Sequence, residues 1–222
     1  MPPDSRKADT EARLPDMRYE RAARRAGARF VAGVDEAGRG PLAGPVVTAA
    51  VILDPKKVPV GVNDSKQLSP AKREALFTEI LQTAMVAVAV APPSVIARLN
   101  IRGATLWAMR QAVLNLATLP DHTLIDGRDV PPGLPGIGQA LIGGDGLSAS
   151  IAAASIVAKV TRDRMCQIMD CDAPVFGFAG HKGYSSQKHL ELLAEHGPCR
   201  HHREDFAPVA EARLRLLGLV PA

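Results

Sequence analysis

Apolar runs separated by polar segments predict five short strands along this chain. The runs are rich in valine, isoleucine and alanine, and turn-forming Gly, Pro, Asn and Asp residues bound them. The predicted strands cover residues 30–34, 46–53, 85–91, 123–125 and 139–142. Because residues 37–45 are rich in glycine and proline, we expect the first two strands to pair as a hairpin.

Apolar residues at helical spacing predict helices between and after these strands. Ser69 followed by Pro70 is typical of a helix start, with the serine oxygen as N-cap and proline in the first turn. The predicted helices cover residues 17–26, 69–83, 94–99, 102–119, 148–169, 187–196 and 209–217, and residues 173–186 are expected to form a loop. Small residues in the helix over 148–169 would let it lie close against the sheet.

This order of elements predicts an α/β fold with a central mixed five-stranded sheet flanked by helices and a small helical C-terminal region. A chain of 222 residues suits one compact domain with such an appendage. Residues 1–29 are polar and charged and lack a sustained apolar stripe. We therefore expect them to form a flexible N-terminal extension.

Composition places the chain among globular proteins, since 46% of its residues are apolar and 23% are charged. The net charge of +4 and the pI near 9.1 suit a polyanionic partner without requiring one. No uncharged apolar stretch reaches the about 18 residues of a membrane helix. The first 29 residues also lack the apolar block of a secretion signal, so we expect a cytoplasmic protein.

The cysteines Cys166, Cys171 and Cys199 form neither an even disulfide set nor a C-x-x-C pair. A zinc site formed by Cys171, Cys199, His201 and His202 is one interpretation, but this spacing matches no common zinc motif. Reduced cysteines that pack in the interior of a cytoplasmic protein are the better interpretation.

Acidic residues follow three of the predicted strands: Asp35 and Glu36, then Asp126, then Asp145. In α/β sheets, functional groups gather beyond the strand ends. Four carboxylates in one place would repel one another unless a cation lay between them, and oxygen ligands without histidine favour Mg²⁺ or Mn²⁺. Alternatively, each acid only caps a turn. Capping is the better interpretation for Asp145 taken alone, whereas two adjacent acids after an apolar strand are costly to bury without a partner.

The tripeptide Gly38, Arg39 and Gly40 would allow backbone amides to approach a ligand closely, with a guanidinium beside them to meet phosphate. It is not a Walker motif, and taken alone it is usually a turn. Lys66 and several other basic residues supply positive charge for a phosphate backbone, although most exposed cations are simply solvated. Tyr184 lies in a Gly- and Ser-containing loop, where its ring either stacks on a sugar or base or packs on the domain surface.

Taken together and in this order, these segments resemble the ribonuclease HII family. The matching segments are VDEAGRGPL at 34–42, NDSK at 63–66, NI at 100–101, AT at 104–105, LIDG at 124–127, IAAASIVAK at 151–159, HKGY at 181–184, HHR at 201–203 and FAPV at 206–209. Any single match could arise by chance, whereas the ordered set is specific to the family.

The resemblance implies a ribonuclease-H-like catalytic domain over residues 30–170 and a C-terminal region over 171–222 that completes the substrate groove. It implies an endonuclease that hydrolyses RNA paired with DNA and incises at single ribonucleotides in duplex DNA, acting as a monomer. Two Mg²⁺ or Mn²⁺ ions would take part and leave 5′-phosphate and 3′-hydroxyl ends. The resemblance assigns the metal to Asp35, Glu36, Asp126 and Asp145, and substrate binding to Gly38, Arg39, Gly40, Lys66 and Tyr184.

The chain departs from the family pattern at four positions. Gly143 stands where many relatives have lysine, Gly146 where serine or alanine is common, Arg128 where asparagine is frequent, and Asp205 where a small polar residue is usual. None of these removes an acid, but the added glycines could loosen Asp145. Two alternatives stay open: a magnesium-dependent phosphotransferase acting on a small nucleotide, and a non-catalytic protein that binds RNA–DNA hybrids.

Overall fold

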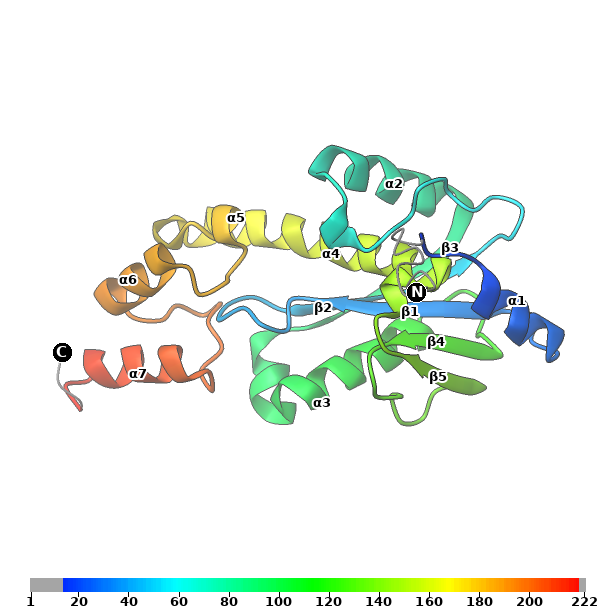
Figure 1. Ribbon diagram of the computed structural model, residues 1–222. Coiled ribbons are helices and arrows are strands. Elements are labelled where there is room, and N and C mark those ends of the chain that lie inside the picture. The colour runs from blue at the N-terminus through cyan, green and yellow to red at the C-terminus, as the bar shows by residue number, and fades with distance from the viewer. Residues whose placement is uncertain (1–13, 220–222) are drawn as a thin grey trace, which may run out of the picture.

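The computed structural model describes residues 14–219, which form one sheet with helices on both faces (Figure 1). The strands are β1 (Val31–Ala37), β2 (Val46–Leu53), β3 (Ala84–Ala91), β4 (His122–Asp126) and β5 (Ile137–Leu141). Their order across the sheet is β3-β2-β1-β4-β5. The first three strands pair antiparallel, while β4 runs parallel to β1 and to β5. The predicted α/β fold with a mixed five-stranded sheet is therefore confirmed.

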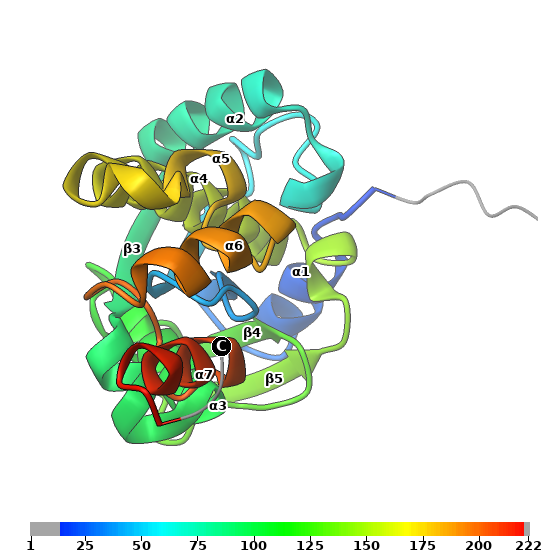
Figure 2. The ribbon, with the colours of Figure 1, turned by 90° about the vertical axis from the view of Figure 1, so that its left-hand side faces the viewer.

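Helices cover both faces of this sheet. The helices are α1 (Arg18–Arg25), α2 (Pro70–Thr83), α3 (Pro93–Leu114), α4 (Ala149–Asp172), α5 (Phe178–His181), α6 (Gln187–His196) and α7 (Ala207–Leu216). Apolar residues of α2 and α4 pack on one face of β2, and α3 packs on the opposite face of β1, β2 and β3. Figure 2 shows these two layers end-on, with α6 and α7 in front of them.

The long helix α4 lies close to the sheet, as its small residues predict. Ser148 caps its first turn by accepting a hydrogen bond from the Ile151 backbone N–H at 3.2 Å. Most of the first ten residues of α4 are alanine or serine, and nearly all of them are buried. A Cβ added to Gly33 of β1 would lie 2.1 Å from the Ser150 carbonyl carbon, so only glycine permits this close approach.

Two predicted helices merge into the single element α3. The expected break falls at Asn100, whose φ of 55° lies in the left-handed region. The Asn100 side chain accepts a hydrogen bond from the Gly103 backbone N–H at 3.0 Å and so starts the second half of the helix. The prediction of two helical segments with a break near residue 100 is therefore confirmed, and the two segments meet at a kink.

The N-terminal segment differs from the flexible extension that we expected. Residues 1–13 lie outside the described part of the chain, but residues 14–29 carry α1, which packs through Ala23 against Val31 and Leu124 of the sheet. Glu20 of α1 is only 1% exposed. The helix predicted over residues 17–26 is thus confirmed, while its packing was missed, because a buried glutamate has the same sequence signal as a solvated one. No helix within residues 14–219 is long and apolar enough to cross a bilayer.

Candidate active site

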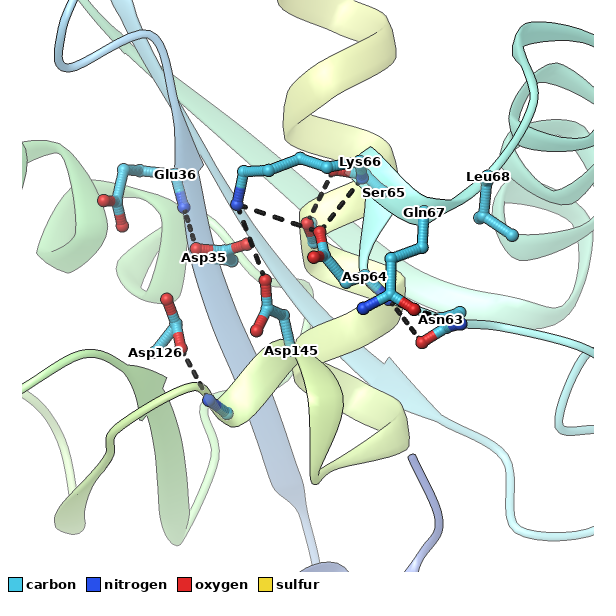
Figure 3. A network of polar contacts seen from close by, with 12 residues as sticks. Asp35, Glu36, Asn63, Asp64, Ser65, Lys66, Gln67, Leu68, Asp126 and Asp145 are labelled. Atoms are coloured by element: carbon cyan, nitrogen blue, oxygen red, sulfur yellow. Dashed lines mark hydrogen bonds and ion pairs between the residues drawn. The ribbon is translucent and has the colours of Figure 1, made fainter. Parts of the chain in front are cut away.

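Three carboxylates from two neighbouring strands meet at one point of the sheet. Asp35 and Glu36 lie within β1, and Asp126 is the last residue of β4, which pairs with β1 in parallel. One oxygen from each of the three lies within 4.8 Å of the others (Figure 3). We predicted that Asp35 and Glu36 follow the first strand. Instead, β1 extends to Ala37 and contains both acids. The sheet therefore holds both acids rigidly.

Asp145 reaches the same place from a turn. It lies in the short 3₁₀ turn Gly144–Gly146, four residues beyond the end of β5. Figure 3 shows its carboxylate between Asp126 and Lys66, whose Nζ lies 3.7 Å from Asp145 Oδ2. The group within 4.8 Å includes only the other three acids among the described residues. Asp145 thus stands at the edge of the cluster rather than at a strand end.

Burial and mutual repulsion make the ionised forms of the clustered acids unfavourable unless a positive charge is added. Burial raises the pKa of Asp35 well above its ordinary value, and the neighbouring carboxylates Glu36 and Asp126 raise it further. Burial also raises the pKa of Glu36, against the opposing effect of the Arg39 guanidinium, whose Nη1 lies 3.3 Å from Glu36 Oε1. A hard divalent cation would relieve this repulsion, and clustered carboxylate oxygens are the ligands that Mg²⁺ and Mn²⁺ prefer. The donor set therefore fits the predicted metals.

In metal-free buffer, the wild type is expected to lose thermal stability relative to Asp35→Asn as the pH rises above about 4. The raised pKa of Asp35 means that the folded state binds more protons than the unfolded state in this range. Stability therefore falls with rising pH until the folded-state carboxyl has ionised. Melting temperatures of both proteins from pH 4 to 8 in EDTA, followed by addition of Mg²⁺, measure this effect. A difference that does not change with pH, or that Mg²⁺ does not reduce, would contradict it.

Lys66 lies at the rim of the acid cluster. Asp64 caps the short turn Ser65–Gln67 by accepting a hydrogen bond from the Lys66 backbone N–H at 3.0 Å. The Lys66 ammonium lies 3.7 Å from both Asp64 and Asp145, and its side chain is 78% exposed. The exposed ammonium can therefore turn toward a phosphate, whereas its two carboxylate partners are held in place by burial.

Two buried arginines hold the loop that contains Gly38, Arg39 and Gly40. Arg203 donates hydrogen bonds to the carbonyl oxygens of Gly38, Arg39 and Gly44. Arg162 donates to the carbonyls of Ala43, Pro45 and Lys182. Both side chains are 1% exposed, and neither forms an ion pair with a carboxylate among residues 14–219. Burial and, to a smaller extent, the nearby Arg162 guanidinium lower the pKa of Arg203 to about 9.

The sequence pointed to both arginines only as positive charge for a phosphate backbone or as solvated cations, and their role as buried donors to the main chain was missed. Their burial depends on main-chain carbonyls of three separate segments, residues 38–39, 43–45 and 182. Hydrophobic periodicity along the sequence does not predict such contacts. The Gly38–Gly40 loop and the Arg162 side chain both line a cavity of about 290 Å³. This cavity is lined by Glu36, Gly38, Arg39, Gly40, Ser65, Lys66, Ser155, Lys159 and Tyr184, among others.

Tyr184 faces the glycine loop across this cavity. Its ring is half exposed and lies 6.0 Å from the Arg162 guanidinium carbon. A Cβ added to Gly40 would lie 3.7 Å from Tyr184 Cε1, so the ring and the loop are in van der Waals reach of each other. The structure thus brings together the predicted binding residues Gly38, Arg39, Gly40 and Tyr184, although they lie more than 140 positions apart in the chain.

The zinc interpretation has no support in the described residues. Within residues 14–219, the three acids form the only group of at least three metal-binding side chains close enough to share an ion. The nitrogens of His202 are already used, since Nδ1 accepts from the Cys199 backbone N–H at 3.0 Å and Nε2 lies 3.0 Å from His189 Nε2. Cys171 is exposed and belongs to no such group. All three cysteines are free.

Known proteins resemble this chain over most of its length. The family described as Ribonuclease HII matches residues 32–209. Curated proteins named Ribonuclease HII from Xanthobacter autotrophicus and Rhizobium johnstonii are both 55% identical, over 93% and 94% of this chain and 82% and 91% of their own length. The crystal structure of the ribonuclease H2 from Pyrococcus horikoshii is 28% identical with a TM-score of 0.73, covering 85% of this chain and 99% of that one.

Proposed function

Because this chain belongs to the ribonuclease HII family, and is thus a ribonuclease H endonuclease with a ribonuclease-H-like fold, we propose that it incises RNA paired with DNA, including single ribonucleotides embedded in duplex DNA. The observation that carries the proposal is the acid cluster, one member of which, Glu36, also lines the cavity that contains Gly38–Gly40 and Tyr184. A phosphodiester bond lying over the acids would have its adjacent sugar within reach of that cavity.

Members of this family depend on divalent metal ions, and four side chains here are suited to hold them. We assign Asp35, Glu36 and Asp126 as ligands, with Asp145 completing the set, for Mg²⁺ or Mn²⁺. Two bound ions would supply an activated water and stabilise the negative charge on the leaving oxygen. Asp35 is the central ligand because it is the most deeply buried of these carboxylates and touches Glu36 directly, its Oδ1 accepting from the Glu36 N–H at 2.7 Å.

The remaining residues of the site would read the sugar and the phosphates. The 2′-hydroxyl is the one group that distinguishes RNA from DNA at a given nucleotide. Gly38 and Gly40 have no side chains that would keep it from the backbone of the loop. The Tyr184 ring would stack on the sugar behind it. Lys66 would contact a phosphate. Since Tyr184 comes from residues 171–222 and the glycine loop from 30–170, we propose that the C-terminal region completes the groove.

The test is cleavage of a labelled DNA duplex that carries one ribonucleotide, with Mg²⁺ or with EDTA. We expect one cut with Mg²⁺ and none with EDTA, leaving 5′-phosphate and 3′-hydroxyl ends and no cyclic phosphate. Binding without cleavage would instead indicate a non-catalytic hybrid-binding protein, and turnover of free nucleotide a phosphotransferase. The site needs one copy of the chain, so a monomer is proposed and size-exclusion chromatography checks it.

Tyr184→Ala is expected to lower kcat/KM on the single-ribonucleotide duplex about 10-fold, whereas Tyr184→Phe stays within about two-fold of wild type. Stacking depends on the ring and not on its hydroxyl, which forms no hydrogen bond in the structure among residues 14–219. Steady-state kinetics on the same duplex measure the difference. Equal losses in both variants would show that the hydroxyl, rather than the ring face, makes the contact.

A further inference from the structure

The N-terminal segment is joined to the turn that carries Asp145. Asp16 forms an isolated parallel bridge with Ser148. Its backbone N–H donates to the Leu147 carbonyl at 3.3 Å, and its carbonyl accepts from the Ala149 N–H at 3.1 Å. These contacts begin two residues after Asp145 and link positions that lie about 130 residues apart in the chain.

Glu20 reinforces this junction from inside the protein. Its Oε1 accepts hydrogen bonds from the Ser148 hydroxyl at 2.6 Å and from the Ser150 backbone N–H at 2.9 Å. The Ser148 oxygen in turn accepts from the Ile151 N–H at 3.2 Å. The first backbone donors of α4 therefore end on Asp16, Glu20 and the serine cap, and the carboxylate lies at the helix end that favours negative charge.

Burying the Glu20 carboxylate costs free energy of folding, which a glutamate on the exposed face of a helix would not. It is 1% exposed, next to the apolar cluster of Ala23, Val31, Leu124 and Ile151, and its Oε2 has no hydrogen-bond partner within the described residues. A half-satisfied buried carboxylate lowers stability unless its remaining contacts are strong. All of those contacts are made to the start of α4.

The turn that carries Asp145 is rich in glycine. Gly143, Gly144 and Gly146 surround the acid, and Gly143 adopts a left-handed φ of 65°. The turn is fixed at one end by the Gly144 N–H, which donates to Asp126 Oδ1 at 2.6 Å. At the other end it runs into Leu147 and Ser148, which the N-terminal segment holds. The contacts of Asp16 and Glu20 with residues 147–150 thus compensate for the glycines that could loosen the acid.

We propose that Glu20 is a positioning residue that sets Asp145 for metal binding, so that the N-terminal helix is part of the catalytic apparatus. This inference rests on the proposed role of Asp145 as a metal ligand. Glu20 touches neither metal nor substrate. It acts through Ser148 and the turn, as residues that orient metal ligands do in other metalloenzymes.

Glu20→Ala is expected to weaken Mn²⁺ binding to the free protein about 10-fold, measured by calorimetry, and to raise the Mg²⁺ concentration for half-maximal cleavage similarly. At saturating metal, KM for the hybrid should stay at its wild-type value. Glu20→Gln is the matched control, because its side-chain oxygen accepts the same two hydrogen bonds, and it should bind Mn²⁺ like the wild type. Both metal midpoints are measured at a temperature where thermal melts show every variant to be folded, because a reversibly unfolded fraction would itself raise them.

A double-mutant cycle with Asp145→Asn decides between outcomes. If Glu20 acts through Asp145, Glu20→Ala causes no further loss of Mn²⁺ affinity in the Asp145→Asn background. A full additional loss there, or unchanged Mn²⁺ binding in Glu20→Ala while Asp145→Asn weakens it, overturns the inference and leaves the proposed function standing. If Asp145→Asn itself leaves Mn²⁺ affinity unchanged, the ligand role of Asp145 and this inference fail together.

Discussion

Asp35→Asn is expected to lower cleavage of the single-ribonucleotide duplex by about 10³-fold or more, while binding of the duplex in EDTA is kept. The amide removes the negative charge at the centre of the cluster, where Asp35 is 4% exposed and lies against both Glu36 and Asp126. Loss of metal-assisted charge stabilisation is worth several kcal/mol, and about 4 kcal/mol corresponds to that factor. Single-turnover cleavage and a filter-binding titration measure the two quantities.

The matched control for this prediction is Asp54→Asn. Asp54 follows β2 and caps an exposed turn by accepting from the Lys56 N–H at 2.9 Å, and no residue of the acid cluster contacts it. Its cleavage rate should equal that of the wild type. If Asp35→Asn cuts at a near wild-type rate, the assignment of Asp35 as the central ligand is wrong.

Gly38→Ala is expected to lower kcat/KM about 100-fold, the second largest effect. Gly38 has a φ of 92°, which alanine rarely adopts, and an added Cβ would lie 1.9 Å from Arg162 Nε. The Arg162 side chain cannot easily move away, because it is buried and donates to three carbonyls. The loop must shift instead, and a shift of about 1 Å in a substrate-positioning group costs about 10²-fold.

A second glycine separates this loss from a general effect of the substitution. Gly180 has no atom within 4 Å of an added Cβ and no left-handed φ, so Gly180→Ala should keep wild-type activity and stability. Kinetics on the ribonucleotide duplex and thermal melts of both variants give the comparison. Wild-type kcat/KM in folded Gly38→Ala would show that the loop does not position the sugar.

The sequence predicted most elements because their local signals agree with their burial. The strand β2 and the helix α6 occupy the predicted residues, and the Ser69 cap of α2 is present, with its oxygen accepting from the Lys72 N–H at 3.3 Å. Apolar patterns and helix caps are local features, and in these elements tertiary packing agrees with them. The end of β1 was placed too early, because a charged residue inside a strand reads as the end of that strand.

Some residues of the candidate site were predicted from the sequence and others were not. The residues of the acid cluster, the glycine loop and Tyr184 were available from the sequence, since the ordered motifs identify the family and chemistry limits which side chains bind cations. The sequence could not reveal the buried roles of Arg162, Arg203 and Glu20, because each depends on partners from distant segments. Charged residues have the same local signal whether water or a buried carbonyl surrounds them.

The sequence by itself determined the order of strands and helices and the set of acids, because hydrophobic periodicity and the family motifs are written in neighbouring residues. Tertiary structure alone decided that β1 and β4 run side by side and bring Asp35 within reach of Asp126. It also decided that the N-terminal helix holds the turn of Asp145. The pairing of distant segments depends on packing of the whole chain, because only packing brings charged residues that are far apart in the sequence into one site.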